Sequence, residues 1–475
     1  MSKIREQLRQ LDKEQLIDII LELREQMAQM SARIQNLEDQ LAKNSQNSSK
    51  APSSDGLKKK PAPKSLREKG KRKTGGQKGH KGKTLKMVSE ADYIKVHTVT
   101  TCSNCQANLS HVEVAEIERR QVFDIPPVEI EVTEHQAEMK CCSCCGTRVK
   151  AEFPEGVSSS VQYGNRLKAQ AVYLNSYQLL PLARICELFT DFYNHSPSES
   201  LILNSNQVLS EAISPALEAI QAQIKASDTV HCDESGMRVE GKLNWLHVLA
   251  TERLTYYGVH LKRGQEAMRD MGLLHELQGR AIHDGWASYL KFDNCRHALC
   301  NAHHLRELRF IFEQYQQTWA NDMFRLLLDI KQEVENRLPQ QMRLAHEQLR
   351  YYRQQYDEIL QQGFNANPAP QQAPYKKRGR RKQSKAKNLL DRLQKYKAET
   401  LAFMSDFRVP FDNNLAERAV RMIKVKQKIS GTFRTRIGAE IFCDIRSYIS
   451  TARKQGQNVI QTIHDALLGR PFIPT

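Results

Sequence analysis

Three acidic residues that are far apart in the chain have the chemistry of a metal-dependent enzyme. Asp233 lies in "TVHCDESGMRV", which has the composition of a strand, Asp284 ends the short strand pattern "GRAIHD", and Glu417 lies near a helix start. Carboxylates that lie close together repel unless a divalent cation lies between them. Mg²⁺ prefers such oxygens, and two ions about 3.5–4 Å apart stabilise the attacking and leaving oxygens of a phosphoryl displacement. We therefore expect Asp233, Asp284 and Glu417 to be catalytic and to bind two Mg²⁺ (or Mn²⁺) ions.

Each aspartate also has a structural interpretation. Asp233 begins "DESG" and Asp284 begins "DGW", and both segments suit turns. Glu234 and Asp293 are alternative metal ligands, although Glu234 should point to the opposite side of its strand from Asp233. Taken singly, aspartates in such positions are more often structural than catalytic.

Glu417 has a structural interpretation of its own, in the segment "FDNNLAERAVR" (411–421). Asn414 can be the N-cap of a helix, and Glu417, three residues later, can close a capping box. Glu417 would then make an ordinary pair with Arg421, four residues further on. The segment alone does not decide between a cap and a metal ligand.

The elements that would position the three carboxylates alternate between strands and helices. Short turns join three strand patterns into an antiparallel meander: "TVHCDESGMRV", 244–251 and 254–262. They are followed by an amphipathic helix at 264–277, a short strand at 279–284, and a strand that runs into a helix at 297–308. This order predicts an α/β fold with a ribonuclease-H-like catalytic core, in which neighbouring strands bring Asp233 and Asp284 together.

The predicted core is interrupted. We expect it to comprise residues 228–309 and 406–440, with a helical insertion that carries a basic loop at 310–405. Glu417 can reach the aspartates only if 310–405 is a true insertion. Residues 441–475 are expected to be helical, and so are residues 153–227, as a DNA-binding domain or one that precedes the core.

Two CxxC pairs predict a structural zinc site in a ribbon at 97–152. Cys102 and Cys105 form the first pair, and four thiolates at this spacing are typical of closed, tetrahedral zinc. The second segment, "KCCSCCGTR", offers Cys141–Cys144 or Cys142–Cys145. We favour Cys142 and Cys145, because Gly146 directly after the last ligand eases the tight turn. The alternative is a set of free cysteines in a small core.

The segment "CRHALCNAHH" (295–304) also has the spacing of metal ligands. Cys295, Cys300, His303 and His304 can form a second zinc site, but Cys300 lies in a strand-like stretch and buried cysteine is common. Alternatively, His303 or His304 approaches the active site and contacts the scissile phosphate.

The positive charge lies in two short segments. Residues 57–83 contain twelve Lys or Arg and one Glu, and residues 375–387 contain eight Lys or Arg and no acid. They carry +11 and +8, which leaves −2 for the rest of a chain whose net charge is +17. Blocks of this kind predict arms that bind nucleic acid. The expected DNA contacts, including those of the later basic stretch "KVKQKISGTFRTRIGA", are Lys71, Arg72, Lys73, Lys78, Lys81, Arg378, Arg380, Arg381, Lys424, Lys428, Arg434 and Arg436.

The N-terminal 1–43 reads as a leucine-zipper-like coiled-coil helix, followed by a basic linker or DNA-binding arm at 44–96. Its apolar residues are spaced alternately by four and three, which favours self-association into a homodimer or higher oligomer: Leu16, Ile20, Leu23, Met27, Met30, Ile34, Leu37 and Leu41. We find no apolar run long enough for a membrane span and no secretory signal. With cysteines clustered as CxxC pairs, this predicts a protein of the reducing cytoplasm.

The motifs in combination resemble those of the transposases of the bacterial insertion-sequence family sixty-six. The zipper helix, "GGQKGHKG" and the CxxC pairs are followed by "HCDESG", "HDGWASY", "CNAHHLREL", "NNLAERAVR" and "FRTRIGAEIFCDIRSYISTARKQGQNV". The resemblance covers nearly the whole chain. It implies a DDE catalytic core, with the three acidic residues at Asp233, Asp284 and Glu417. The doubled cysteines of "CCSCCG" depart from the pattern and leave the second pair of zinc ligands open.

The resemblance implies DNA transposition by a bacterial, nucleoid-associated enzyme. Such an enzyme would bind the terminal inverted repeats of its element, use a metal-activated water to expose 3′-OH groups, and join these to target DNA. Accessory proteins of the same element are further expected partners. A zipper, a zinc ribbon and basic arms also fit a dimeric DNA-binding regulator without catalytic activity, and a structure-specific nuclease is a third hypothesis.

Overall fold

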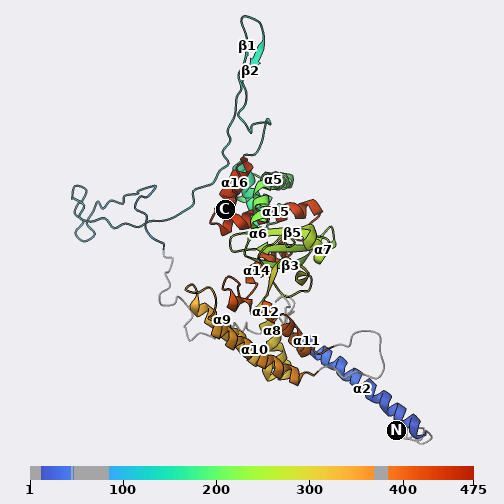
Figure 1. The fold of residues 1–475 in the computed structure, drawn as a ribbon. Helices are drawn as coiled ribbons and strands as arrows, with labels where there is room; N and C mark the ends of the chain where they lie inside the picture. The colour runs from blue at the N-terminus through green and yellow to red at the C-terminus, as the bar shows by residue number, and fades with distance from the viewer. Residues whose placement is uncertain (1–11, 44–46, 48–84, 369–382) are drawn as a thin grey trace, which may run out of the picture.

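The computed structural model describes residues 12–43, 47, 85–368 and 383–475. A five-stranded sheet with helices on both faces is joined to a second, helical layer (Figure 1). Helix α2 projects from the helical layer, and the segment that contains the CxxC pairs extends from the opposite end (Figure 1). Within the described residues, no helix combines the length and the apolar composition needed to cross a bilayer.

The sheet has the strand order β5-β4-β3-β6-β7. The strands are β3 (Thr229–Val239), β4 (Lys242–Ala250), β5 (Thr255–His260), β6 (Arg280–His283) and β7 (Arg296–Leu299). Strands β3, β4 and β5 form an antiparallel meander, whereas β6 and β7 run parallel to β3. The meander and the two later strands confirm the order predicted from the sequence. The fold is therefore a mixed α/β one.

One predicted helix is shorter than expected. The amphipathic pattern at 264–277 gives only α7 (Gln265–Asp270). Gly272 has φ +69°, a left-handed conformation that ends a helix, and turns follow it. The helix pattern beyond Gly272 therefore reflects buried residues of an irregular segment, among them Leu273 and Leu277.

The two faces of β3 belong to different hydrophobic clusters. Val230 and Cys232 pack with residues of α6 (Ser214–Ala226) and α7. Met237 and Val239, at odd-numbered positions, pack on the other face with α14 (Asn414–Ile429) and the start of α15 (Arg436–Lys454). Because side chains alternate along a strand, Asp233 shares the face covered by α14.

Helix α15 covers the edge strand β5. The backbone N–H of Tyr257 donates to Ser447 Oγ at 2.8 Å, and that of Thr255 donates to Thr451 Oγ1 at 3.0 Å. Both hydroxyls are buried. These hydroxyls thus accept from backbone N–H groups of β5 that could otherwise pair with a further strand. The edge of the sheet is therefore protected from pairing with another chain.

The helices between β7 and α14 form their own hydrophobic cluster. They are α8 (Asn301–Tyr315), α9 (Thr318–Arg337), α10 (His346–Ala366), α11 (Lys385–Lys395), α12 (Lys397–Thr400) and α13 (Ala402–Ser405). Trp319, Leu327 and Leu390 are buried at its centre. The chain leaves the sheet after β7 and returns to β3 and β4 at α14.

The segment before the sheet is helical, as predicted. Its elements are α3 (Asn165–Val172), the π-helix η2 (Tyr173–Tyr177), α4 (Leu182–Tyr193), α5 (Glu199–Ala212) and α6. The C-terminal helix α16 (Val459–Leu467) packs on α3 and α5, so the expected helical C-terminus is also present. A short 3-10 turn, η3 (Tyr289–Lys291), lies between β6 and β7.

Two elements have few contacts with this body. Helix α2 (Lys13–Ala42) begins with a capping box between Asp12 and Gln15, and most of its large apolar side chains are exposed. Residues 85–161 contain only the short strands β1 (Met139–Cys141) and β2 (Arg148–Lys150), and Val122, for example, is 90% exposed. No hydrophobic side chain of 97–152 belongs to the buried core.

Candidate active site

Asp233 and Asp284 lie at the same end of adjacent parallel strands. The register pairs His231 of β3 with Ile282 of β6, so Asp233 and Asp284 each follow this pair by two residues. Asp233 is largely buried, whereas Asp284, directly after β6, is exposed. Asp284 Oδ1 also accepts the N–H of Trp286 at 2.8 Å, so the "DGW" segment is a turn as well. The structural and functional interpretations of Asp284 are therefore compatible.

The capping interpretation of Glu417 is wrong. The N-cap of α14 is Asn413, not Asn414, and no side chain caps the helix. Asn413 is used elsewhere: its Nδ2 donates to Cys232 O at 2.8 Å, and its Oδ1 lies 2.9 Å from His231 Nδ1. These bonds fix the start of α14 on β3 directly before Asp233. Glu417, one turn along the helix, is thereby held near the strand ends.

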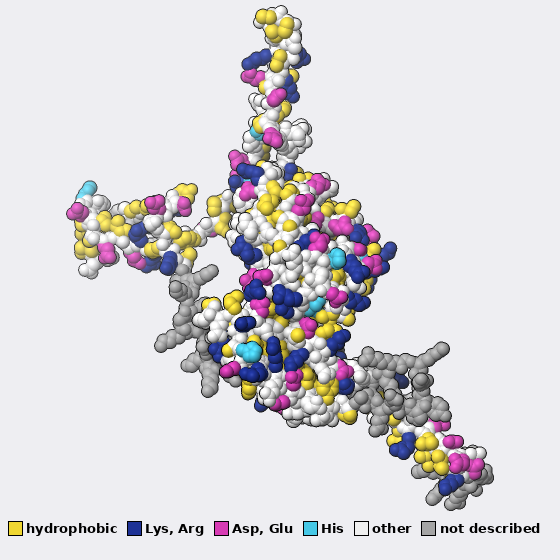
Figure 2. All heavy atoms as spheres, viewed as in Figure 1, with side chains coloured by type: hydrophobic (Ala, Val, Ile, Leu, Met, Phe, Trp, Pro, Cys, Tyr) yellow, Lys and Arg dark blue, Asp and Glu magenta, His cyan; other side chains and the backbone are white. Residues whose placement is uncertain are grey.

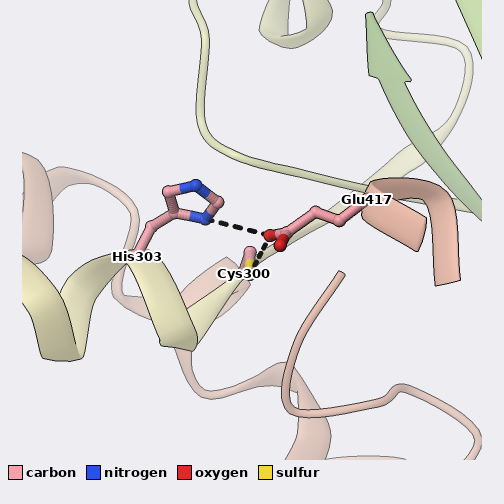
Figure 3. A group of neighbouring side chains, drawn as sticks. All are labelled: Cys300, His303 and Glu417. Carbon is pink, nitrogen blue, oxygen red and sulfur yellow. Dashed lines mark hydrogen bonds and ion pairs between the residues drawn. The ribbon is translucent and has the colours of Figure 1, made fainter. Parts of the chain in front are cut away.

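Glu417 lies between two side chains from the start of α8. Its Oε1 is 3.7 Å from His303 Nδ1 and 4.0 Å from Cys300 Sγ (Figure 3). The expected pair with Arg421 is present but loose, at 3.9 Å. Burial lowers the pKa of His303, while burial and Glu417 raise the pKa of the Cys300 thiol to about 12.

Cys300, His303 and Glu417 are the only group of three or more potential metal ligands found among the described residues with donor atoms within 4.8 Å of one another. The three predicted catalytic carboxylates do not all meet at that distance. They nevertheless share one electrostatic environment. Burial and the charges of Glu234, Asp284 and Glu417 raise the pKa of Asp233 to about 8.

The acidic cluster fits a divalent cation. Asp233 is partly buried beside three carboxylates, and its Oδ1 accepts the N–H of Glu234 at 2.9 Å. A cation between the carboxylates would offset their mutual repulsion and allow Asp233 to ionise. The donors are oxygens, which Mg²⁺ and Mn²⁺ prefer.

Glu234 points away from Asp233, as expected from strand alternation. It accepts two bonds from Arg263, at 2.9 and 2.6 Å, and a bond from Tyr289. The Arg263 guanidinium lies 4.2 Å from the ring centroid of Trp286 and also stacks near Trp245. Arg263 could not be predicted from the sequence, because its loop position after β5 carries no local signal. The alternative ligand Asp293 is exposed in the loop before β7.

The spacing allowed a second zinc site of four ligands, but the structure does not bring all four together. Cys295 Sγ lies 3.7 Å from Phe292 O, and His304 Nδ1 lies 3.2 Å from Asn301 Oδ1. Of the four proposed ligands, only Cys300 and His303 lie together, and they face Glu417. The α8 helix begins at Asn301, so Cys300 and His303 share its first turn, while His304 points into the core.

The two CxxC segments form matching turns. The N–H of Gln106 donates to Cys102 O at 3.0 Å, and the N–H of Gly146 donates to Cys142 O at 2.9 Å. Gln106 and Gly146 both have positive φ, +61° and +71°. The four cysteines Cys102, Cys105, Cys142 and Cys145 do not, however, gather within the described residues. The segment has no buried core to draw its halves together, so only shared metal ligation would do so.

The predicted DNA contacts divide into two groups. Lys71, Arg72, Lys73, Lys78, Lys81, Arg378, Arg380 and Arg381 lie outside the described residues. Of the others, Lys428 and Arg434 are exposed near the end of α14, whereas Lys424 donates to Gly236 O at 2.8 Å and Arg436 pairs with Glu440 at 2.8 Å. Lys and Arg side chains gather on the visible face between the sheet and the helical layer (Figure 2).

The sequence matches models of known protein families over most of its length. Residues 160–441 match the Transposase IS66 family, and this span covers more than half of the 475 residues. The chain belongs to the IS66 transposase family. Residues 100–152 match the zinc-finger binding domain of transposase IS66, and residues 2–86 match a family of unknown function, DUF6444. No curated protein matches the chain.

Family membership makes the chain an insertion-sequence transposase with a DNA-binding zinc finger. The zinc-finger match agrees with the predicted ribbon at 97–152 and supports structural zinc there. The transposase match supports an enzyme that processes DNA with a divalent metal. The motifs that carried the resemblance thus identified the family correctly.

Proposed function

We propose that the chain is a DDE transposase that binds the terminal inverted repeats of its insertion sequence and catalyses metal-dependent strand cleavage and strand transfer. The observation that supports the proposal is that Asp284 and Glu417, which belong to two other segments of the chain, both lie close enough to Asp233 to raise its pKa. We infer that the core is ribonuclease-H-like, because a three-stranded meander extended by two parallel strands from β3 has that topology.

Each carboxylate would have a distinct task. Asp233 is partly buried and would lie between the ions, since the charged groups that raise its pKa are Glu234, Asp284 and Glu417. Asp284 is exposed and would face the DNA backbone. Glu417 is held by α14 and would complete the ligand set. Two Mg²⁺ (or Mn²⁺) ions bound there would supply the Lewis acid that stabilises the attacking and leaving oxygens.

The DNA would cross the face that carries the basic residues. Lys428 and Arg434, exposed beyond Glu417 on the same helix and the following loop, suit the phosphates that flank the scissile bond. The two basic segments outside the described residues, together with the zinc finger, would add contacts on either side. Such contacts fix the register of DNA in the site without reading its sequence.

We also propose that α2 pairs two copies of the chain as a parallel coiled coil. In its heptads, positions a are Ile20, Met27, Ile34 and Leu41, and positions d are Leu16, Leu23, Met30 and Leu37. Seven of these eight are more than half exposed, from Leu23 and Leu37 at 52% to Leu41 at 83%. Isoleucine at a with leucine at d favours a coiled coil of two parallel helices.

Two further observations support this arrangement. Asp39, at position f opposite the seam, accepts bonds from Tyr315 and Lys385, both at 2.6 Å. The body of the protein therefore contacts α2 on the side opposite the a and d positions, so these positions remain available for a partner helix. In a parallel pair, Arg33 at g would also face Glu38 at e of the partner helix, which is an attractive pairing.

The catalytic assignment is tested by Asp284→Asn in a cleavage assay on DNA that carries the element ends. The variant should bind this DNA as the wild type does but should lose Mg²⁺-dependent cleavage. Asp293→Asn, which changes an exposed aspartate outside the cluster, is the matched control and should cut normally. Normal cutting by Asp284→Asn would overturn the assignment and favour a DNA-binding regulator.

A further inference from the structure

Within the described residues, Cys300, His303 and Glu417 form a cluster of potential metal ligands, and the proposed catalytic chemistry uses only Glu417 of the three. Cys300 is the N-cap of α8 and His303 lies in its first turn, while Glu417 comes from α14, more than a hundred residues later. Their donor atoms point toward one another (Figure 3). Magnesium chemistry has no use for a thiol or an imidazole, because Mg²⁺ prefers oxygen ligands.

The spacing of the donor atoms is close to that of tetrahedral zinc. Zinc bonds of about 2.3 Å to sulfur and about 2.0–2.2 Å to nitrogen and oxygen place ligands roughly 3.6 Å (S to O) and 3.4 Å (N to O) apart. The observed distances from Glu417 Oε1 are 4.0 Å to Cys300 Sγ and 3.7 Å to His303 Nδ1. A small rotation of the flexible Glu417 side chain would close the difference.

One polar atom of the cluster has no hydrogen-bond partner. His303 Nδ1 is buried without a hydrogen bond, and its 3.7 Å separation from Glu417 is too long to be one. Cys300 Sγ accepts the N–H of Asn413 at 3.2 Å, and such a bond also suits a metal-bound thiolate. A buried nitrogen without a partner is costly, so a bound ion would satisfy the group that the protein leaves open.

We propose that Cys300, His303 and Glu417 bind one Zn²⁺ ion, at a site separate from the zinc finger. A thiolate, an imidazole and a carboxylate are the ligand types that zinc takes in proteins, and three protein ligands leave a fourth position for water or a phosphate oxygen. On binding, the Cys300 thiol releases its proton to solvent, because the thiolate is the ligand. The site shares only Glu417 with the proposed magnesium centre.

The shared ligand has a functional consequence, which rests on the proposed function. Glu417 cannot serve Zn²⁺ and complete the magnesium centre with the same oxygen. Zinc bound between α8 and α14 would therefore withdraw the third carboxylate from catalysis. The site would act as a zinc-dependent inhibitor of strand cleavage, because it takes Glu417 from the magnesium centre, while Cys300 and His303 lie outside that centre.

The direct test is the zinc content of the full-length protein, measured by titration of metal-stripped protein with Zn²⁺ alone, without Mg²⁺ or DNA. The wild type should bind two ions per chain, one in the finger and one at the new site. Cys300→Ser and His303→Asn should each bind one. Cys295→Ser, which changes a buried neighbouring cysteine outside the cluster, is the control and should bind two.

A second measurement makes the result independent of misfolding. Cobalt bound in place of zinc should give a thiolate charge-transfer band whose intensity falls in both Cys300→Ser and His303→Asn while circular dichroism stays unchanged. A wild type that binds only one ion, or a Cys300→Ser variant that still binds two, would overturn the proposal. Neither readout involves cleavage, so failure here leaves the proposed catalytic role of Glu417 intact.

The inhibition of strand cleavage by zinc is tested in a separate experiment. In a cleavage assay at fixed Mg²⁺, half-inhibition of Cys300→Ser should need at least tenfold more Zn²⁺ than half-inhibition of the wild type, each measured relative to its own activity without zinc. Equal sensitivity in the two proteins would show that the site, even if it binds zinc, does not control Glu417.

Discussion

At the residue scale, the turns of the zinc finger point to one set of ligands. Cys142 occupies the same place in its turn as Cys102, and a residue with positive φ follows the second cysteine of each pair, Cys105 or Cys145. The neighbouring Cys141 ends β1, where its backbone pairs with Arg148. We therefore propose Cys142 and Cys145 as the second pair and Cys141 and Cys144 as bystanders.

This register gives a prediction from a matched pair of variants. Cys145→Ser removes a ligand and should abolish tight zinc binding by the finger, because three thiolates no longer close the tetrahedron. Cys144→Ser, one residue away and equally exposed, should bind zinc as the wild type does. The measurement is zinc affinity in competition with a chromophoric chelator. If Cys144→Ser lost tight zinc binding while Cys145→Ser kept it, the second pair of ligands would be Cys141 and Cys144.

The sequence could identify single residues only where the chemistry was local. The acidic residues and the CxxC pairs belong to short motifs, so they could be proposed from the sequence. Asn413 was missed as the N-cap because its side chain bonds β3, almost two hundred residues earlier, and not its own helix. The sequence allowed His303 or His304 to approach the active site, but the contact of Cys300 with Glu417 was missed, because it depends on how two distant helices pack.

At the element scale, α15 stabilises the sheet through hydroxyl groups at its edge. Ser447 and Thr451 are one turn apart, so both face β5, where each accepts a strand N–H. Such N–H groups would be unsatisfied and buried if the hydroxyls were removed. The helix therefore contributes bonds as well as hydrophobic packing to β5.

Thr451→Val keeps the shape of the side chain but removes the hydroxyl that accepts from Thr255. It should lower the free energy of unfolding by about 1–3 kcal/mol, because a buried N–H loses its partner. Urea denaturation measures the change. Thr190→Val removes an exposed hydroxyl that bonds only within its own helix, and should change stability by less than about 0.5 kcal/mol. Equal effects would mean that α15 acts through packing alone.

Element types followed from periodicity better than element ends did. The alternation in β3 and β4 predicted the meander, since one residue in two must face each hydrophobic cluster. The end of α7 depended on the conformation of Gly272, and the start of α14 on a tertiary bond of Asn413. Neither is encoded in the period of the hydrophobic pattern.

At the scale of the whole molecule, buried histidines make stability depend on pH. Burial lowers the pKa of His247 to about 4 and that of His283 to about 3. Because these folded-state values lie below the usual 6.5, the folded protein binds fewer protons than the unfolded chain at acidic pH. Their contribution to stability is complete above pH 6.5 and is lost as the pH falls toward the folded-state pKa.

For His247 alone, the free energy of unfolding should fall by about 2 kcal/mol between pH 7 and pH 5. His247→Gln should remove that part of the pH dependence, whereas His195→Gln, at an exposed position, should leave it unchanged. Urea denaturation of the metal-stripped protein at the two pH values measures the slope. If the free energy of unfolding of His247→Gln depended on pH as strongly as that of the wild type, His247 could not be buried in its neutral form.

The proposed dimer is also a property of the whole molecule. Leu23→Glu places a charge at position d of α2 and should convert the dimer to a monomer at micromolar concentration, as measured by light scattering. Leu21→Glu is the control, because Leu21 is similarly exposed, at 57%, but lies at position b outside the seam. Dissociation by both variants, or by neither, would contradict pairing through the a and d positions.

The overall plan was predictable because its parts carry separate signals. Helix α2, the CxxC pairs and the alternating core are each visible in the sequence. The sequence also predicts a helical insertion at 310–405, but not the bonds of Asn413 through which the chain returns to the sheet. The chain returns from α13 to β3 through Asn413, and only that return gives Glu417 a place beside Asp233 and Asp284.

The central claim, that Glu417 completes a catalytic site with the two aspartates, is tested most directly by Glu417→Gln. The measurement is Mg²⁺-dependent strand cleavage of DNA that carries the element ends, with DNA binding followed in parallel. We predict that cleavage is lost while binding persists, and that Glu313→Gln, on the exposed surface of α8, cuts as the wild type does. Wild-type cleavage by Glu417→Gln would contradict the account.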